Sequence, residues 1–123
     1  MKTKRWILMF FVLIIFAFAQ TQALAGFYAG NDLITSMREY DKTEANPSGA
    51  KVDFDEAWKY LGYITGVYDA TEYLYNTPDK VTQRQLAAVV SKYLKNNPEK
   101  WNEPAALLVM NALQEAFPLK KSK

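Results

Sequence analysis

Residues 60–70 read YLGYITGVYDA, and this stretch decides the expected fold because it combines helical spacing with two glycines. At about 3.6 residues per turn, the apolar face of this helix carries Ala57, Leu61, Ile64 and Tyr68. Gly62, Gly66 and Ala70 lie nearly opposite. Each interior glycine costs roughly 1 kcal/mol relative to alanine. We therefore expect the small residues to form a seam against which another helix backbone packs closely.

The remaining sequence predicts three more helices and no strand. The expected helices span residues 31–42, 53–75, 82–96 and 103–117, separated by turn-forming segments. Asp53 with Glu56, and Thr82 with Gln85, have the spacing of a capping box, which marks a helix start. We therefore expect an all-α fold: a compact four-helix bundle with a central second helix, formed by one domain over residues 26–123.

The N-terminus has the three parts of a secretory signal peptide. Residues 1–5 are basic, residues 7–19 are an unbroken apolar run, and Ala23 and Ala25 are small residues suited to a cleavage site. The run is shorter than the roughly 20 apolar residues that usually cross a membrane. We expect residues 1–25 to be a signal peptide cleaved after Ala25, with an uncleaved anchor as the alternative.

Composition excludes several classes of protein. Lys2, Lys4 and Arg5 leave with the signal peptide, so carboxylates slightly outnumber basic side chains in residues 26–123 and no nucleic-acid footprint remains. The chain has neither cysteine nor histidine. Zinc, copper and haem ligands of the usual kinds are therefore missing, as are Ser–His–Asp and Cys–His nucleophiles. We expect no cofactor, no metal and no enzymatic activity.

One acidic cluster has two interpretations. Asp53, Asp55 and Glu56 have the residue types of an acid–base or calcium site. Acids are also favoured at helix starts because they cap the first turn and complement the helix dipole. We favour the capping interpretation.

Two surfaces are expected to stay free of the bundle. Arg84, Ser91 and Lys95 lie away from the apolar stripe of the third helix. The connector that follows, residues 97–102, is short and polar around one large aromatic, Trp101. An aromatic on a polar loop can anchor a binding pocket. The alternative is that Trp101 folds back onto the bundle.

A series of short motifs runs through the whole of residues 26–123. They are GND at 30–32, GYITGVYDA at 62–70, Pro78 with Val81 and Thr82, Asn97 with Pro98, and Ala112 and Leu113 through Pro118. In this order, behind a signal peptide, they resemble the Rap/Tai family, the immunity proteins of type VI secretion amidase effectors. The sequence departs from that family at the positions where cysteines are expected, which are Met37, Tyr60, Asn76 and Leu119.

The resemblance implies a function and a set of residues. Family members are all-helical, typically homodimeric, periplasmic proteins that bind a secreted peptidoglycan amidase and block its active site through a helix surface and a loop before the last helix. The matching effector-binding residues here are Arg84, Ser91, Lys95, Asn97, Glu99, Lys100, Trp101 and Asn102. The structural motif is Gly62, Gly66, Asp69 and Ala70, with Asp69 as a hydrogen-bonding residue. The alternative function is a general periplasmic helical module for protein interaction or structure, without inhibitory activity.

The signal peptide generates the first prediction. If it is cleaved after Ala25, the mature protein begins at Gly26 and is recovered from the periplasm without a membrane anchor. Mass spectrometry of the protein purified from a periplasmic extract checks both points. An intact form beginning at Met1 and confined to the membrane fraction would contradict the prediction.

Overall fold

The computed structural model describes residues 1, 3–4, 27–45 and 51–120 of the chain. Most of the predicted signal peptide, including its cleavage site, lies outside these residues. Within the described residues, no helix is long and apolar enough to cross a membrane.

The all-α prediction is confirmed, with four helices in the described residues. Helix α2 spans Gly30–Ala45, α3 spans Phe54–Thr71, α4 spans Gln83–Asn96 and α5 spans Ala105–Ala116. Short 3-10 turns follow α3 at Glu72–Leu74 and α4 at Pro98–Lys100. Helix α3 was expected to continue to residue 75, but its last residues tighten into the first of these turns.

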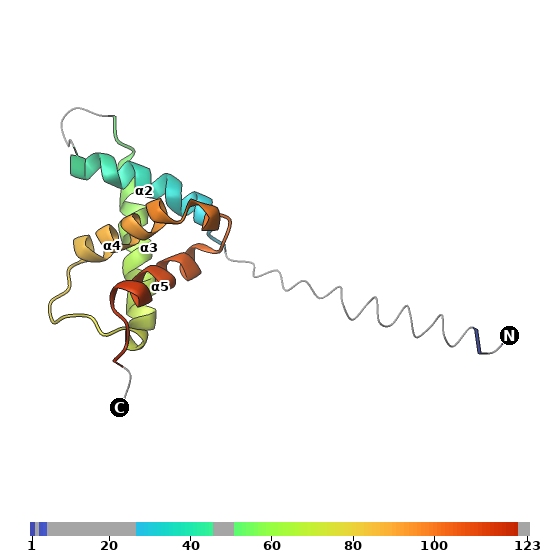
Figure 1. Cartoon of the computed structure of the whole chain (residues 1–123). Helices are drawn as coiled ribbons and strands as arrows, with labels where there is room; N and C mark the ends of the chain where they lie inside the picture. The colour runs from blue at the N-terminus through green and yellow to red at the C-terminus, as the bar shows by residue number, and fades with distance from the viewer. Residues whose placement is uncertain (2, 5–26, 46–50, 121–123) are drawn as a thin grey trace.

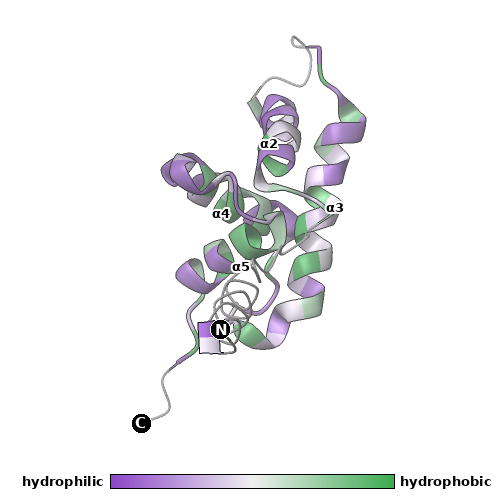
Figure 2. Ribbon diagram, turned by 90° about the vertical axis from the view of Figure 1, so that its right-hand side faces the viewer, coloured by the Kyte–Doolittle hydropathy of each residue, from purple (hydrophilic) through white to green (hydrophobic). Residues whose placement is uncertain are grey.

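The second helix of the fold, α3, is central, as predicted. It contacts α2, α4 and α5. In Figure 1 it crosses behind these three helices, and Figure 2 shows all three on one side of it. The other helices therefore form a layer that α3 ties together.

The buried face of α3 is made of Ala57, Tyr60, Ile64 and Tyr68. Tyr60 is fully buried, and its hydroxyl donates to the Ala87 carbonyl of α4 at 2.9 Å. Burial raises the pKa of Tyr60, so the phenol stays protonated as a hydrogen-bond donor. Ala87 is itself fully buried, and its small side chain leaves room for the tyrosine to reach the helix backbone.

The glycine seam is not part of this contact, and the expectation that it packs inside the bundle is wrong. Gly62 and Gly66 are exposed, and a Cβ atom added to either would meet no atom within 4 Å. Asp69 and Ala70 are exposed on the same helix. The reason is that α3 has only one buried face, and the small residue that permits close approach lies on α4, at Ala87.

Gly30 is the glycine that the fold does require. A Cβ atom at this position would lie 2.5 Å from both Leu108 Cδ1 and the Trp101 carbonyl oxygen, and 2.8 Å from the Glu103 carbonyl oxygen. The Gly30 N–H donates to Glu103 at 2.9 Å, and the Ala105 N–H donates to the Tyr28 carbonyl at 3.1 Å. The start of α2 is therefore fastened directly to the start of α5.

A polar network that includes Tyr28 joins α2 to α3. Ser36 is fully buried and donates a hydrogen bond to Glu56, and Tyr28 Oη lies 2.6 Å from Ser36 Oγ. Glu56 also pairs with Lys59. The Lys59 and Ser36 hydrogen bonds lower the pKa of Glu56, so the carboxylate stays ionised as an acceptor.

Gly30 is tightly enclosed and Gly66 faces open space, so replacing each with alanine should have opposite effects on stability. Gly30→Ala should lower the free energy of unfolding by about 1–3 kcal/mol, because the added methyl group meets backbone oxygens that cannot move aside. Gly66→Ala should raise it by about 0.5–1 kcal/mol, because the methyl group meets open space and alanine is the better helix former. Urea unfolding of both variants beside the wild type measures the difference. Equal effects of the two substitutions would contradict this account of the glycines.

Candidate functional site

The candidate surface combines one side of α4 with the connector that leads to α5. The start of α4 is fixed by a complete capping box, as the sequence predicts. The Thr82 hydroxyl accepts from the Gln85 N–H at 3.2 Å, and the Gln85 side chain accepts from the Thr82 N–H at 2.8 Å. The side chains that follow therefore project from a well-defined first turn.

Two of the predicted residues on α4 are exposed but already paired. Arg84 bonds both carboxylate oxygens of Glu44 at 2.9 Å, and Lys95 pairs with Asp41 at 2.7 Å. Glu44 and Asp41 both belong to α2, so the pairs bridge an open groove of about 430 Å³ between the two helices. Exposed ion pairs of this kind contribute roughly 0–1 kcal/mol each and can exchange partners readily.

The third predicted residue on α4, Ser91, does not face solvent. It is 6% exposed, and its hydroxyl donates to Asp41 at 3.2 Å. Ala87 and Ser91 lie on the buried side of α4, where their small side chains allow the helix to pack closely. The expectation that Ser91 is exposed is therefore wrong.

The connector is held in place by its own side chains. Asn97 donates to the Tyr93 carbonyl at 2.8 Å, and Lys100 donates to the Tyr93 hydroxyl at 3.1 Å while lying over its ring. The hydrogen bond to Tyr93 raises the pKa of Lys100, which keeps its positive charge. Glu99 and Asn102 remain exposed at the surface of the connector.

Trp101 supports the connector from beneath. It is partly buried against the core, its indole N–H donates to the Leu94 carbonyl at 2.8 Å, and the Arg38 guanidinium lies 5.7 Å from the centre of its ring. The alternative interpretation from the sequence, that Trp101 folds back onto the bundle, describes this arrangement. The exposed tip of the connector is formed by its neighbours, Glu99 and Asn102.

Sequence reasoning missed three residues that shape this surface. Asp41 and Glu44 lie one turn apart on α2, and the basic residues of α4 are their natural partners, so charge pairing offered a signal for them. The sequence around Arg38 does not indicate its role, because its partner is an aromatic ring far away in the sequence. A long-range contact of this kind appears only in the folded chain.

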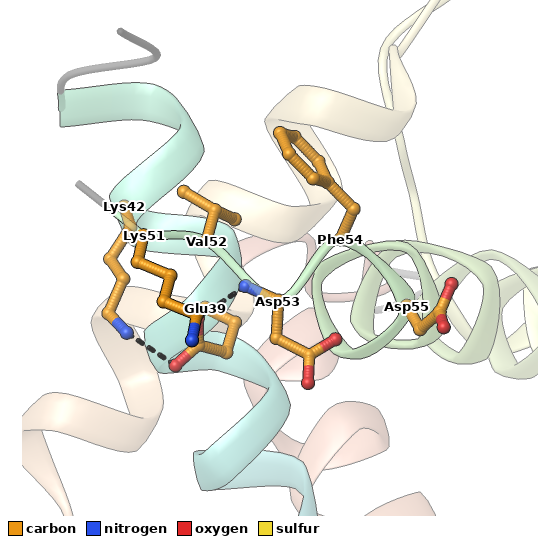
Figure 3. A pocket seen from close by; sticks show the side chains of 7 residues that line it. All are labelled: Glu39, Lys42, Lys51, Val52, Asp53, Phe54 and Asp55. Atoms are coloured by element: carbon orange, nitrogen blue, oxygen red, sulfur yellow. Dashed lines mark hydrogen bonds and ion pairs between the residues drawn. The ribbon is translucent and has the colours of Figure 1, made fainter. Parts of the chain in front are cut away.

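A second hollow lies where α2 meets the start of α3 and is shown in Figure 3. Glu39 accepts from the Asp53 N–H at 2.9 Å and pairs with Lys42 at 2.5 Å, and both contacts lower the pKa of Glu39. Asp53 accepts from the Glu56 N–H at 3.1 Å, as a helix cap does. These carboxylates therefore act as structural groups, and the described part of the chain brings together no three that could hold a metal ion.

The candidate surface as a whole presents ion pairs, exposed amides and a braced connector. A rigid connector loses little conformational entropy when it is bound, which favours a role in recognition.

Comparison with known proteins gives a clear result at the level of the family. The family model of the Rap1a immunity proteins matches residues 29–119, which include all of α2 to α5. A search of curated proteins finds no match.

The bracing role of Trp101 generates a prediction about stability. Trp101→Phe should cost about 1 kcal/mol of unfolding free energy, because it removes the indole hydrogen bond to the Leu94 carbonyl, which keeps only the Asn97 N–H at 3.3 Å, but it keeps a ring against Arg38. Trp101→Ala should cost more, toward about 3 kcal/mol, because it also empties the site of the ring. Urea unfolding measures both, with Trp58→Phe as the control at an exposed tryptophan. A Trp101→Ala variant as stable as the wild type would show that the indole braces nothing.

Proposed function

The chain belongs to the Rap1a family of immunity proteins, and on that premise we propose that it binds and blocks a type VI secreted peptidoglycan amidase. Such an amidase cuts peptide bonds in the cell wall, and the immunity protein protects the cell that makes it. Family membership implies an inhibitor of an effector rather than an enzyme. The amidase as the target, and the periplasm as the place of action, are part of the proposal.

The braced connector is the observation that carries this proposal. Its backbone is fastened to the start of α2 by the Gly30–Glu103 hydrogen bond, and its aromatic residue is tied to α4 through Leu94. An inhibitor that fills an active site benefits from a loop already held in its bound shape, since less ordering is needed on association. Glu99 and Asn102 are the exposed polar side chains that such a loop presents.

The N-terminal sequence supports action in the periplasm. The first backbone contact that fastens α2 to α5 is made by Tyr28. Cleavage after Ala25 would leave that contact and helices α2 to α5 intact. The proposed mature protein therefore keeps the complete fold after export.

A homodimer is also part of the proposal, as the family resemblance implies. In a dimer, the α4 side of one subunit and the connector of the other could contact one effector together. Arg84 and Lys95 suit this role because their exposed pairs with Glu44 and Asp41 can be exchanged for pairs with a partner at little cost.

The decisive test is binding to an amidase encoded beside this chain. The wild type should bind it in a calorimetric titration and should protect cells that produce it in the periplasm. Replacing both Glu99 and Asn102 with alanine should weaken binding by about tenfold, or about 1.4 kcal/mol, with the fold unchanged because both side chains are exposed.

Two controls accompany this test. Circular dichroism confirms that the double variant is folded, and Asp79→Ala removes an exposed carboxylate from the turn before α4, at the opposite end of that helix from the connector. The proposal fails if the wild type neither binds the amidase nor protects the cells.

A further inference from the structure

Helix α3 leaves one side of the molecule uncovered. Figure 2 shows α3 along one edge, with α2, α4 and α5 all on its other side. The uncovered side, called here the outer face of α3, carries Phe54, Trp58, Gly62, Gly66, Asp69 and Ala70. All six of these residues are exposed.

The outer face holds two large aromatic side chains in water. Trp58 is 62% exposed, and Phe54, one turn earlier, is 54% exposed. Trp101, by contrast, is tied to the bundle through its indole N–H. Exposed tryptophans are the side chains that most often become the buried anchors of protein interfaces. Trp58 is therefore the strongest candidate anchor among the described residues.

Two glycines, which have no side chain, lie on α3 beside Trp58. Gly62 and Gly66 follow it at one and two helical turns, and a Cβ atom added to either would meet open space. Interior glycines lower the stability of a helix, and no contact within the described chain offsets that loss. A partner whose backbone lies against the glycines would come into close contact with the helix next to the Trp58 ring.

The charged side chains of this helix are mostly negative. Residues 54–72 contain four carboxylates and one lysine. The lysine, Lys59, is paired with Glu56. Asp55, Asp69 and Glu72 remain as exposed carboxylates around the aromatic and glycine residues.

The negative charge of α3 favours some binding partners of its outer face over others. A second copy of the chain that presented the same face would bring like charges together, which disfavours self-pairing here. A segment that carries lysine or arginine would meet opposite charge at both ends of the helix. Charge complementarity therefore favours a basic partner.

We propose that the outer face of α3 is a second docking surface for the effector, and that it receives a basic segment of that protein. Trp58 is the apolar anchor, Gly62 and Gly66 allow the segment to lie close to the helix, and Asp55 and Asp69 pair with its basic side chains. This inference rests on the proposed function, because the partner is the same secreted amidase. It adds a site distinct from the connector, on the opposite side of α3 from the other helices.

The test is a calorimetric titration of purified variants with the amidase encoded beside this chain, at low and at high salt. Trp58→Ala should weaken binding by about tenfold or more. Gly62→Leu should weaken it to a similar extent by blocking close approach, while leaving the helix folded because leucine is the better helix former. Asp69→Asn should weaken binding at low salt and have little effect at high salt.

Matched controls come from outside the outer face of α3. Leu107→Ala removes an exposed apolar side chain from α5, and Asp79→Asn removes an exposed carboxylate from the turn before α4. Both should bind like the wild type. Circular dichroism confirms that each variant is folded.

The outcomes separate this inference from the proposed function. If the wild type does not bind the amidase, the proposed function fails and this inference fails with it. If the wild type binds and Trp58→Ala binds equally well, only the docking surface on α3 is wrong. Sedimentation of each protein alone tests the remaining occupant, since a dimer that Trp58→Ala converts to a monomer would assign the face to a second copy and overturn the proposal.

Discussion

The contact between the start of α2 and the start of α5 is the constraint on which the rest of the structure depends. Gly30 lies so close to the backbone oxygens of Trp101 and Glu103 that no side chain fits there. Hydrogen bonds on both sides of this contact align residues 28–30 with residues 103–105 as a short antiparallel bridge. The connector is thereby held at its C-terminal end by backbone, and Trp101 holds it to α4 by its side chain. The GND motif at residues 30–32 thus has a physical role in shaping a segment far away in the sequence.

Packing holds this fold together without disulfides, since the chain contains no cysteine. Of the four positions where relatives are expected to carry cysteine, Met37 and Tyr60 lie in the core between α2 and α3. Tyr60 fills that space with a ring that contacts the Tyr40 ring at 5.3 Å between centroids, and it adds a buried hydrogen bond to Ala87. An aromatic pair and a satisfied buried hydroxyl contribute stability without any covalent link. The interface between α2 and α3 is therefore closed by side-chain volume and hydrogen bonding.

Local signals in the sequence were sufficient to locate the helices but insufficient to determine which residues of each helix are buried. The capping residues Asp53 and Thr82 and the breaks at the prolines located the helices, because these effects act within one turn of the chain. The packing side of α3 was predicted correctly at Ala57, Ile64 and Tyr68, but the glycines on the opposite side were wrongly expected to form a second contact. Ser91 was misplaced because a small polar residue can lie at a close helix contact as easily as on the surface. The position of Trp101 depends on Leu94 and Arg38, and the second of these contacts has no local trace in the sequence.

The bridge between residues 28–30 and 103–105 also determines when the chain can finish folding. Its two halves lie near opposite ends of the domain, so closing it requires a large loop and is entropically costly until the intervening helices have packed. Contacts of such long sequence separation slow folding relative to helical proteins dominated by local contacts. The N-terminal helix cannot be locked in place before α5 has been synthesised. Folding of this domain is consequently completed late, once α5 is available to receive the start of α2.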